Sequence, residues 1–217
     1  MTDSKGFLIS FEGPDQSGKS TQLTLLAEVA EKNGLPCLGI REPGGTPVGE
    51  EIRNLLLDPE YKGMNYWTEA LLYAASRAQM VADVIRPSLN SGKMVLSDRF
   101  IDSSLIYQGM ARGLGVEEIY KLNMMATGNL RPDVTFVFHV SVKVSRKRLV
   151  DLCKQYGEKP DRIESEKDEF HRMVERGYRE LEEMFPERIV PIYGKLQIPE
   201  IHEKIKRICN ERLGLNL

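Results

Sequence analysis

The 217-residue chain carries 30 Lys and Arg against 32 Asp and Glu, and its formal net charge of −2 lacks the basic bias that double-stranded nucleic acid or an anionic membrane would favour. Three widely spaced cysteines form no CxxC pair, which argues against a disulfide framework or a zinc site and favours the reducing cytoplasm. No apolar run of about 18 residues follows the polar start, so we expect a soluble, unprocessed protein with a single domain over residues 1–217.

Short apolar runs alternate along the chain with longer amphipathic segments, an order typical of βαβ units. The predicted strands are Phe7–Phe11, Pro36–Ile40, Lys93–Ser97, Val134–Val140 and Arg188–Ile192. The predicted helices are Lys19–Asn33, Val48–Leu57, Thr68–Asn90, Val116–Thr127, Ser165–Met184 and Ile198–Leu213. We therefore expect an α/β fold with three layers, in which helices flank a five-stranded parallel sheet.

The segment after the first predicted strand has the spacing G-x-x-x-x-G-K-[ST] of a phosphate-binding P-loop. Its glycines allow backbone N–H groups to surround phosphate oxygens, Lys19 can reach the β- and γ-phosphates, and the Ser20 hydroxyl can bind Mg²⁺. The alternative is a Gly-rich loop that only connects strand to helix. The residues expected to bind ATP are Gly13, Pro14, Asp15, Gln16, Ser17, Gly18, Lys19, Ser20 and Thr21.

A P-loop alone does not separate a kinase from a switch GTPase, a motor or a transport ATPase. The guanine-reading N-K-x-D element is absent from the sequence, whereas Asp98 and Arg99 follow the third predicted strand. At the carboxyl edge of a parallel sheet, Asp98 can hold Mg²⁺ through water, and Arg99 offers the planar fork that suits phosphate. A surface salt bridge is the alternative for this pair.

Five stretches carry a family resemblance: F-E-G-P-D-Q-S-G-K-S-T at 11–21, R-E-P-G-G-T at 41–46, D-R-F at 98–100, Y-Q-G at 107–109 and D-R-I-E at 161–164. On these stretches the chain resembles bacterial-type thymidylate kinases, which are P-loop nucleoside monophosphate kinases, along nearly its whole length. The resemblance implies phosphoryl transfer from ATP to dTMP, which yields dTDP and ADP for dTTP and DNA precursor synthesis. It also implies Mg²⁺ as cofactor and a homodimer through the helices at 48–57 and 68–90.

The resemblance also places the acceptor nucleotide. Tyr73 and Arg77 lie four residues apart on one helical face, so the ring can stack on a pyrimidine while the guanidinium donates to a base carbonyl. The alternative assigns Tyr73 to an apolar stripe and Arg77 to solvent. By resemblance, Asp15 accepts from the 3′-hydroxyl and Tyr107 disfavours a 2′-hydroxyl. The full expected acceptor set is Asp15, Arg41, Glu42, Pro43, Arg53, Tyr73, Arg77, Arg99, Ser104, Tyr107 and Gln108.

The segment 146–163 is predicted to be a short mobile lid, because Gly157 and Pro160 interrupt any helix there. Its basic residues are Arg146, Lys147, Arg148, Lys154, Lys159 and Arg162. The P-loop has no basic residue before Lys19, and the resemblance then implies a lid arginine at the transferring phosphate. Arg162 is therefore expected to be catalytic together with Lys19 and Arg99, although Lys154 stands near the place of another family arginine. A solvated charged loop is the alternative.

Two other functions remain compatible with the sequence. One is a kinase that acts on a different nucleoside monophosphate or on a deoxynucleoside, because these enzymes share the P-loop. The other is a nucleotide-binding regulator without turnover. Acceptor-dependent release of ADP separates the three.

Overall fold

The computed structural model describes residues 6–157, 159–193 and 196–217, so residues 1–5 of the polar start and residue 158 of the predicted lid lie outside the described residues. In these ranges the strands are β1 (Phe7–Glu12), β2 (Cys37–Arg41), β3 (Met94–Asp98), β4 (Val134–His139) and β5 (Ile189–Tyr193). All of them pair in parallel, in the order β2-β3-β1-β4-β5. The predicted five-stranded parallel sheet is confirmed.

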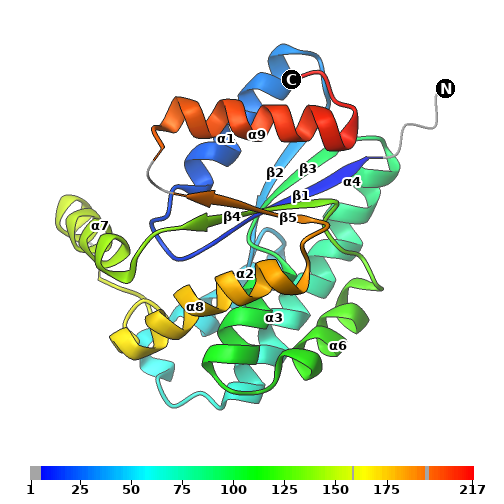
Figure 1. Ribbon diagram of the computed structural model, residues 1–217. Helices are drawn as coiled ribbons and strands as arrows, with labels where there is room; N and C mark the ends of the chain where they lie inside the picture. The colour runs from blue at the N-terminus through cyan, green and yellow to red at the C-terminus, as the bar shows by residue number, and fades with distance from the viewer. Residues whose placement is uncertain (1–5, 158, 194–195) are drawn as a thin grey trace.

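Helices cover both faces of the sheet, as Figure 1 shows. The longer ones are α1 (Lys19–Lys32), α2 (Pro47–Leu57), α3 (Tyr66–Met80), α6 (Val116–Thr127), α7 (Val142–Tyr156), α8 (Asp168–Met184) and α9 (Ile198–Leu213). The shorter ones are η1 (Pro59–Tyr61), η2 (Val81–Ile85), α4 (Arg86–Asn90), α5 (Ile101–Ser104) and η3 (Leu105–Ala111). α1 and α9 lie on one face, while α3, α4, α6 and α8 lie on the other. The three-layer prediction is confirmed, and no helix of the described ranges combines the length and apolarity needed to cross a membrane.

The central strand β1 contributes to the core on both of its faces, because successive side chains of a strand point to opposite sides. Ile9 and Phe11 pack in one cluster with Leu26 of α1 and Ile205 of α9. Leu8 packs in a second cluster with residues of η2 and β3. Burial on both faces is what a parallel sheet requires. It fixes β1 in the centre, so that the loop after β1 emerges at the middle of the carboxyl edge.

The long helix predicted at Thr68–Asn90 is three consecutive helical segments in the structure. An α-helix, α3, passes into the π-helical turn η2, and a second α-helix, α4, follows from Arg86. Pro87 stands in the first turn of α4, directly after η2, and its lack of a backbone N–H falls where the hydrogen-bond pattern changes from π to α. The π-helical turn η2 thus lies just before the proline, and the α-helical pattern resumes in α4.

Besides the short helix η1, two helical regions of the described residues were not predicted. One comprises α5 and η3, which immediately follow Phe100 at the end of β3. The other is α7, so much of the segment 146–163 is helix and not loop. The Ser141 side chain accepts from the Val144 N–H at the start of α7, and the helix ends at Gly157 in a left-handed conformation. Leu149 is the buried residue of α7, and the helix was not predicted because Gly157 and Pro160 favoured a loop in this basic segment.

Candidate active site

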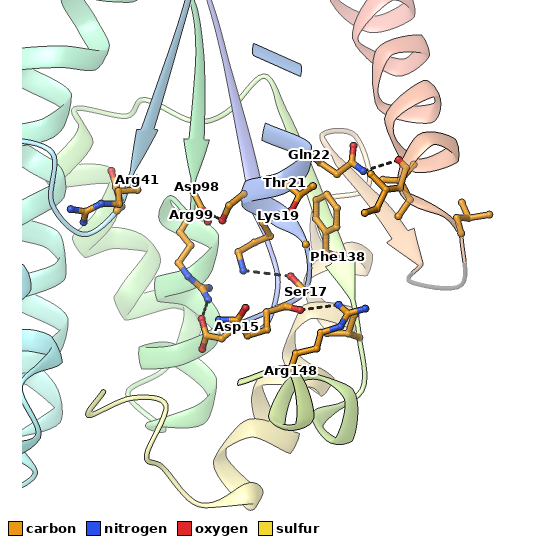
Figure 2. Close-up of a pocket in the computed structure, with 18 of the residues that line it drawn as sticks. Asp15, Ser17, Lys19, Thr21, Gln22, Arg41, Asp98, Arg99, Phe138 and Arg148 are labelled. Carbon is orange, nitrogen blue, oxygen red and sulfur yellow. Dashed lines mark hydrogen bonds and ion pairs between the residues drawn. The ribbon is translucent and has the colours of Figure 1, made fainter. Parts of the chain in front are cut away.

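The predicted P-loop forms the turn between β1 and α1, at the carboxyl edge of the sheet (Figure 2). Gly13 has a φ of 137° and Gly18 a φ of 100°, which L-residues with side chains rarely adopt. A Cβ atom on Gly13 would lie 2.5 Å from the Phe138 carbonyl oxygen, so the loop passes too close to β4 for a side chain. These two glycines allow the chain to curl from the strand into the helix.

Lys19, the first residue of α1, turns back over this loop. Its Nζ donates to the carbonyl oxygens of Pro14 at 2.8 Å and Gly13 at 3.2 Å. Burial, with the positive charge of Arg99 as the next contribution, lowers the pKa of Lys19 from 10.5 to about 8. A negative charge in the loop would favour the protonated amine, so a phosphate group is the type of ligand that suits this position.

A cavity of about 540 Å³ opens at the P-loop, a size typical of small-molecule sites. All predicted ATP-binding residues except Gly13 and Pro14 line it, and these two contribute the carbonyl groups that hold Lys19. The apolar side chains of Ile198 and Ile201 at the start of α9 also line the cavity. The predictions did not include these two residues. A cavity lined by both charged and apolar side chains suits a nucleotide.

Ser20 and Asp98 meet at the edge of this cavity. The Ser20 Oγ donates to Asp98 Oδ2 at 2.5 Å, and both residues line the cavity. In the described part of the chain, no group of three or more His, Cys, Asp or Glu side chains could hold a metal ion. Mg²⁺ prefers oxygen ligands and is commonly held by one or two protein groups together with substrate phosphates. This pair therefore fits Mg²⁺ that is shared with a nucleotide.

Arg99 adopts a left-handed backbone conformation, with a φ of 71°. The Arg99 N–H donates to the Phe11 carbonyl at 3.0 Å and the Phe100 N–H to Glu12 Oε1 at 2.7 Å, so bonds to β1 hold the residue on both sides. The guanidinium donates to Asp15 Oδ1 at 2.5 Å and to the Ser103 Oγ at 3.0 Å. The backbone bonds to β1 and the side-chain bond to Asp15 therefore orient Arg99 toward the P-loop (Figure 2).

A second pocket of about 100 Å³ adjoins the first. All predicted acceptor-binding residues except Arg41 line it, while Arg41 lines the larger cavity. The residues that line both are Asp15, Glu42, Arg53 and Arg99. Two compartments that share two arginines and two carboxylates are suited to two ligands that meet end to end.

Arg77 lies in this second pocket and is buried, so the alternative that it is solvated is wrong. Its Nε donates to Glu42 Oε2 at 2.6 Å, Nη1 to the Ser104 Oγ at 2.9 Å and Nη2 to the Phe100 carbonyl at 2.9 Å. Nη1 also donates to the Asn123 side-chain oxygen. Bonds on three nitrogens fix the plane of the guanidinium, which gives the pocket a rigid donor.

Two polar atoms in this pocket have no hydrogen-bond partner among the described residues, the hydroxyl of Tyr107 and Oε1 of Glu42. Both residues are buried, and burial raises the pKa of each. An unpartnered buried polar atom costs stability. These two atoms are therefore available to a bound molecule.

Two arginines bond to the acceptor loop predicted at 41–46. Arg41 Nη1 donates to the Pro43 carbonyl at 3.2 Å, and Arg53 Nη1 donates to the same oxygen at 3.0 Å. Arg41 also forms an exposed ion pair with Glu50. Arg41 of this loop and Arg53 of α2 thus place positive charge at the larger cavity, and Arg53 also lines the smaller pocket.

Arg162, the predicted catalytic arginine of the lid, does not line either compartment. It is buried, its Nε donates to the Leu56 carbonyl at 2.6 Å, and its Nη1 donates to Glu69 Oε2 at 2.7 Å. Its neighbours Asp161 and Ile163 do line the smaller pocket. The structure therefore places Arg162 as an anchor behind the pocket.

Arg148 is the lid cation that the structure brings to the larger cavity. It lines the cavity and donates to the Gln16 carbonyl at 2.9 Å, while the Ser145 Oγ donates to the Asp15 carbonyl at 2.7 Å. Both residues belong to α7, which therefore packs on the P-loop (Figure 2). Sequence reasoning counted Arg148 among six lid cations but did not single it out, because the helix that aims it was not predicted.

Glu12 was also missed, although a glutamate at the end of an apolar strand is itself a signal. Its side chain is fully buried behind the P-loop. It accepts from the Phe100 N–H, from the Ser103 Oγ at 2.5 Å and from the Tyr178 hydroxyl at 3.2 Å. Ser103 and Tyr178 in turn accept from Arg99, so Glu12 supports the groups that hold that arginine.

Comparison with known proteins gives one consistent family. The family model described as thymidylate kinase matches residues 11–205. The thymidylate kinase of Symbiobacterium thermophilum is 46% identical over 205 residues, which is 94% of this chain and 93% of that protein. The thymidylate kinase of Kosmotoga olearia is 45% identical over 212 residues, which is 96% of this chain and 99% of that protein.

The comparison with solved structures points to the same family. The crystal structure of thymidylate kinase from Ehrlichia chaffeensis superposes with a TM-score of 0.75 at 32% identity, covering 95% of this chain and 99% of that one. The structural match includes the sheet that carries the P-loop, and the family match begins at Phe11 in β1. On these grounds the chain belongs to the thymidylate kinase family.

Proposed function

We propose that this protein is an ATP-dependent nucleoside monophosphate kinase that transfers the γ-phosphoryl group of ATP to dTMP and yields dTDP and ADP. The observation that carries the proposal is the pair of adjoining compartments that share Asp15 and Arg99. Membership of the thymidylate kinase family supports dTMP as the acceptor over other monophosphates. Neither a deoxynucleoside kinase nor a regulator without turnover is favoured by these relatives.

ATP occupies the larger cavity in this proposal. The P-loop N–H groups and the start of α1 bind the phosphates, Lys19 binds the β- and γ-phosphates, and Arg148 lies over the loop. Ser20 and Asp98 supply the oxygens that fit Mg²⁺. When bound, Mg²⁺ would offset phosphate charge and hold the donor in position.

dTMP occupies the smaller pocket. Tyr73 stacks on the base, Arg77 donates to a base carbonyl, and Ser104 and Gln108 contact the base edge. Asp15 accepts from the 3′-hydroxyl and Tyr107 crowds the 2′ position. Glu42 and Pro43 form the wall, Arg53 lines both compartments, and Arg41 lines the ATP cavity. Because one methyl group discriminates only about 10- to 200-fold, dUMP is expected to be a weaker substrate.

The reaction is an in-line attack of a dTMP phosphate oxygen on the γ-phosphorus of ATP. It needs positioning and charge stabilisation and no covalent enzyme intermediate. Arg99 is suited to bind the phosphate at which the two nucleotides meet, since it lines both compartments. The segment 146–163 acts as a lid that excludes water. Arg148 is then the lid cation nearest the P-loop, while a catalytic role for Arg162 requires a rearrangement that frees it from Glu69.

The proposal includes a homodimer and a cytoplasmic location. Apolar side chains lie exposed on α2 and α3, among them Val48, Leu55, Trp67 and Leu71, and such a surface favours pairing of two copies. All three cysteines are free, which suits a reducing compartment. Light scattering of the purified protein and of Leu71→Glu tests the dimer, because a charge in a two-fold interface should give a monomer.

A panel of acceptors tests the proposed function. The protein is incubated with ATP, Mg²⁺ and one of dTMP, dUMP, dCMP, dAMP, dGMP or thymidine, and the release of ADP is measured. The expected result is release that depends on the acceptor and is fastest with dTMP. Release with thymidine but not dTMP would support a deoxynucleoside kinase, and the absence of acceptor-dependent release would refute kinase activity. The variant Lys19→Met serves as the negative control, because the P-loop fold remains while the phosphate-binding amine is lost.

A further inference from the structure

The inference concerns Glu69, which no motif singled out. Glu69 lies on α3, is fully buried and accepts from three different side chains. Arg112 donates through Nε at 3.1 Å and Nη2 at 3.0 Å, Arg162 through Nη1 at 2.7 Å, and Gln108 through Nε2 at 2.9 Å. Burial opposes ionisation, but the bonds from Arg112 and Gln108 hold the pKa of Glu69 below its usual value. Glu69 is therefore an ionised carboxylate that only accepts hydrogen bonds.

This acceptor fixes the orientation of the Gln108 amide. A glutamine amide has a donating end and an accepting end, and a carboxylate can pair only with the donating NH₂. The amide oxygen of Gln108 must then face away from Glu69. Gln108 is buried and lines the smaller pocket, and no donor in the described part of the chain reaches its oxygen. The pocket consequently presents this oxygen as an acceptor.

The pyrimidine bases differ at the atoms that such an acceptor would contact. N3 carries a proton in thymine and uracil, whereas in cytosine N3 is a lone pair and the neighbouring group is an amine. The rigid donor Arg77 suits the O4 carbonyl of thymine and uracil, and the Gln108 oxygen suits their N3–H. Cytosine would place a lone pair against an oxygen and an amine against a guanidinium. A site with such fixed polar groups rejects mismatched ligands strongly.

We propose that Glu69 is a specificity-determining positioning residue, which holds the Gln108 amide so that its oxygen faces N3 of the base and thereby selects thymine and uracil nucleotides over cytosine nucleotides. The inference rests on the proposed binding of dTMP in the smaller pocket. Glu69 acts through Gln108 and does not itself line the pocket.

A merely structural role for Glu69 predicts a different result. Through Arg162 and Arg112, Glu69 links the segment 161–164 to α3 and to the end of η3. Loss of that link would weaken the binding or turnover of every acceptor alike. A change in the ratio of kcat/KM between two bases is therefore the readout that separates positioning of Gln108 from general support of the fold.

The test is Glu69→Gln, a change of one atom that gives residue 69 an amide able to donate. The Gln108 amide can then turn and present its NH₂ to the pocket. We expect the ratio of kcat/KM for dTMP to that for dCMP to fall at least ~10-fold, while the ratio for dTMP to dUMP stays unchanged because both bases carry N3–H. Arg112→Lys is the matched control, because it alters the same cluster but leaves Glu69 ionised, and it should keep both ratios.

Replacement of Glu69 leaves two buried arginines with less negative charge, which could prevent folding. Glu69→Gln combined with Arg112→Gln removes one charge of each sign, and it is expected to give the same fall in the dTMP to dCMP ratio. An unchanged ratio in either folded variant, or an equal fall in Arg112→Lys, would overturn the inference. Preference of the unaltered protein for dCMP would overturn both this inference and the proposed acceptor, so the two failures are distinguishable.

Discussion

Glu12 provides a test of the physical reasoning that does not depend on any ligand. Burial, reinforced by the negative charge of Asp102, raises the pKa of Glu12 from 4.5 to about 7, although hydrogen bonds from Ser103 and Phe100 oppose this. In the unfolded chain the carboxyl group has its ordinary pKa. Between the two values the folded protein therefore binds one proton more than the unfolded chain does. Its free energy of unfolding must fall as the pH rises through this window.

The magnitude follows from the two pKa values, because each pKa unit corresponds to about 1.4 kcal/mol. The contribution of Glu12 is fully present below pH 4.5 and is lost by the time the pH has passed 7, a total of about 3 kcal/mol. Glu12→Gln keeps the volume and a hydrogen-bonding oxygen but does not titrate. The difference in stability between the unaltered protein and this variant should thus change by roughly 2 to 3 kcal/mol between pH 5 and pH 8, to the disadvantage of the unaltered protein.

Urea unfolding followed by circular dichroism at pH 5, 6, 7 and 8 measures this difference, since the free energy in water comes from linear extrapolation. Glu180→Gln is the control, because this exposed glutamate lies on the same helix as Tyr178 and should leave the pH dependence unaltered. Parallel pH curves for the unaltered protein and Glu12→Gln would refute the assignment of a raised pKa to Glu12. A curve for Glu12→Gln that falls more steeply with pH would refute the sign of the effect.

Other substitutions test separate parts of the site. Arg99→Ala should lower kcat about 100-fold or more in the ADP-release assay with little change in melting temperature, because a charge at the transferring phosphate acts in the transition state; an unchanged kcat would contradict its role. Tyr73→Ala should raise the KM for dTMP about 10-fold with a smaller effect on the KM for ATP, because base stacking on an aromatic ring is lost. Arg188→Leu should lower the free energy of unfolding by about 3 to 5 kcal/mol in urea, because Asp102 loses its buried ion-pair partner.

Short sequence patterns were sufficient to predict the parallel sheet and the P-loop. The apolar runs place β1 and β4, because strands buried on both faces consist of continuous apolar residues. The glycine spacing after β1 predicts the P-loop, because it needs only a few consecutive residues with particular backbone conformations. The position of Asp98 beside the P-loop followed from the rule that parallel strands end at the same edge of the sheet, and the structure adds its bond to Ser20.

Contacts between distant segments could not be predicted in this way. The D-R-I-E stretch predicted Arg162 at the transferring phosphate, but Glu69, 93 residues away in the sequence, holds its guanidinium behind the pocket. Glu12 meets the Phe100 N–H across 88 residues. α7 was missed for another reason, since Gly157 and Pro160 favoured a loop although Leu149, Leu152 and Tyr156 follow helical spacing. With α7 missed, nothing distinguished Arg148 from the other lid cations.

The pairing of arginines with carboxylates from other segments explains why such distant contacts matter for the site. Two of the three arginines that line the smaller pocket pair with a carboxylate from another segment, the buried Arg77 with Glu42 and the partly buried Arg99 with Asp15. A buried arginine without such a partner would be strongly destabilising, so the carboxylate is required before any substrate can use the arginine. The same carboxylate also fixes the direction in which the remaining N–H groups point. In the proposed complex, acidic residues therefore set the choice of base and the position of the phosphate as much as the basic residues do.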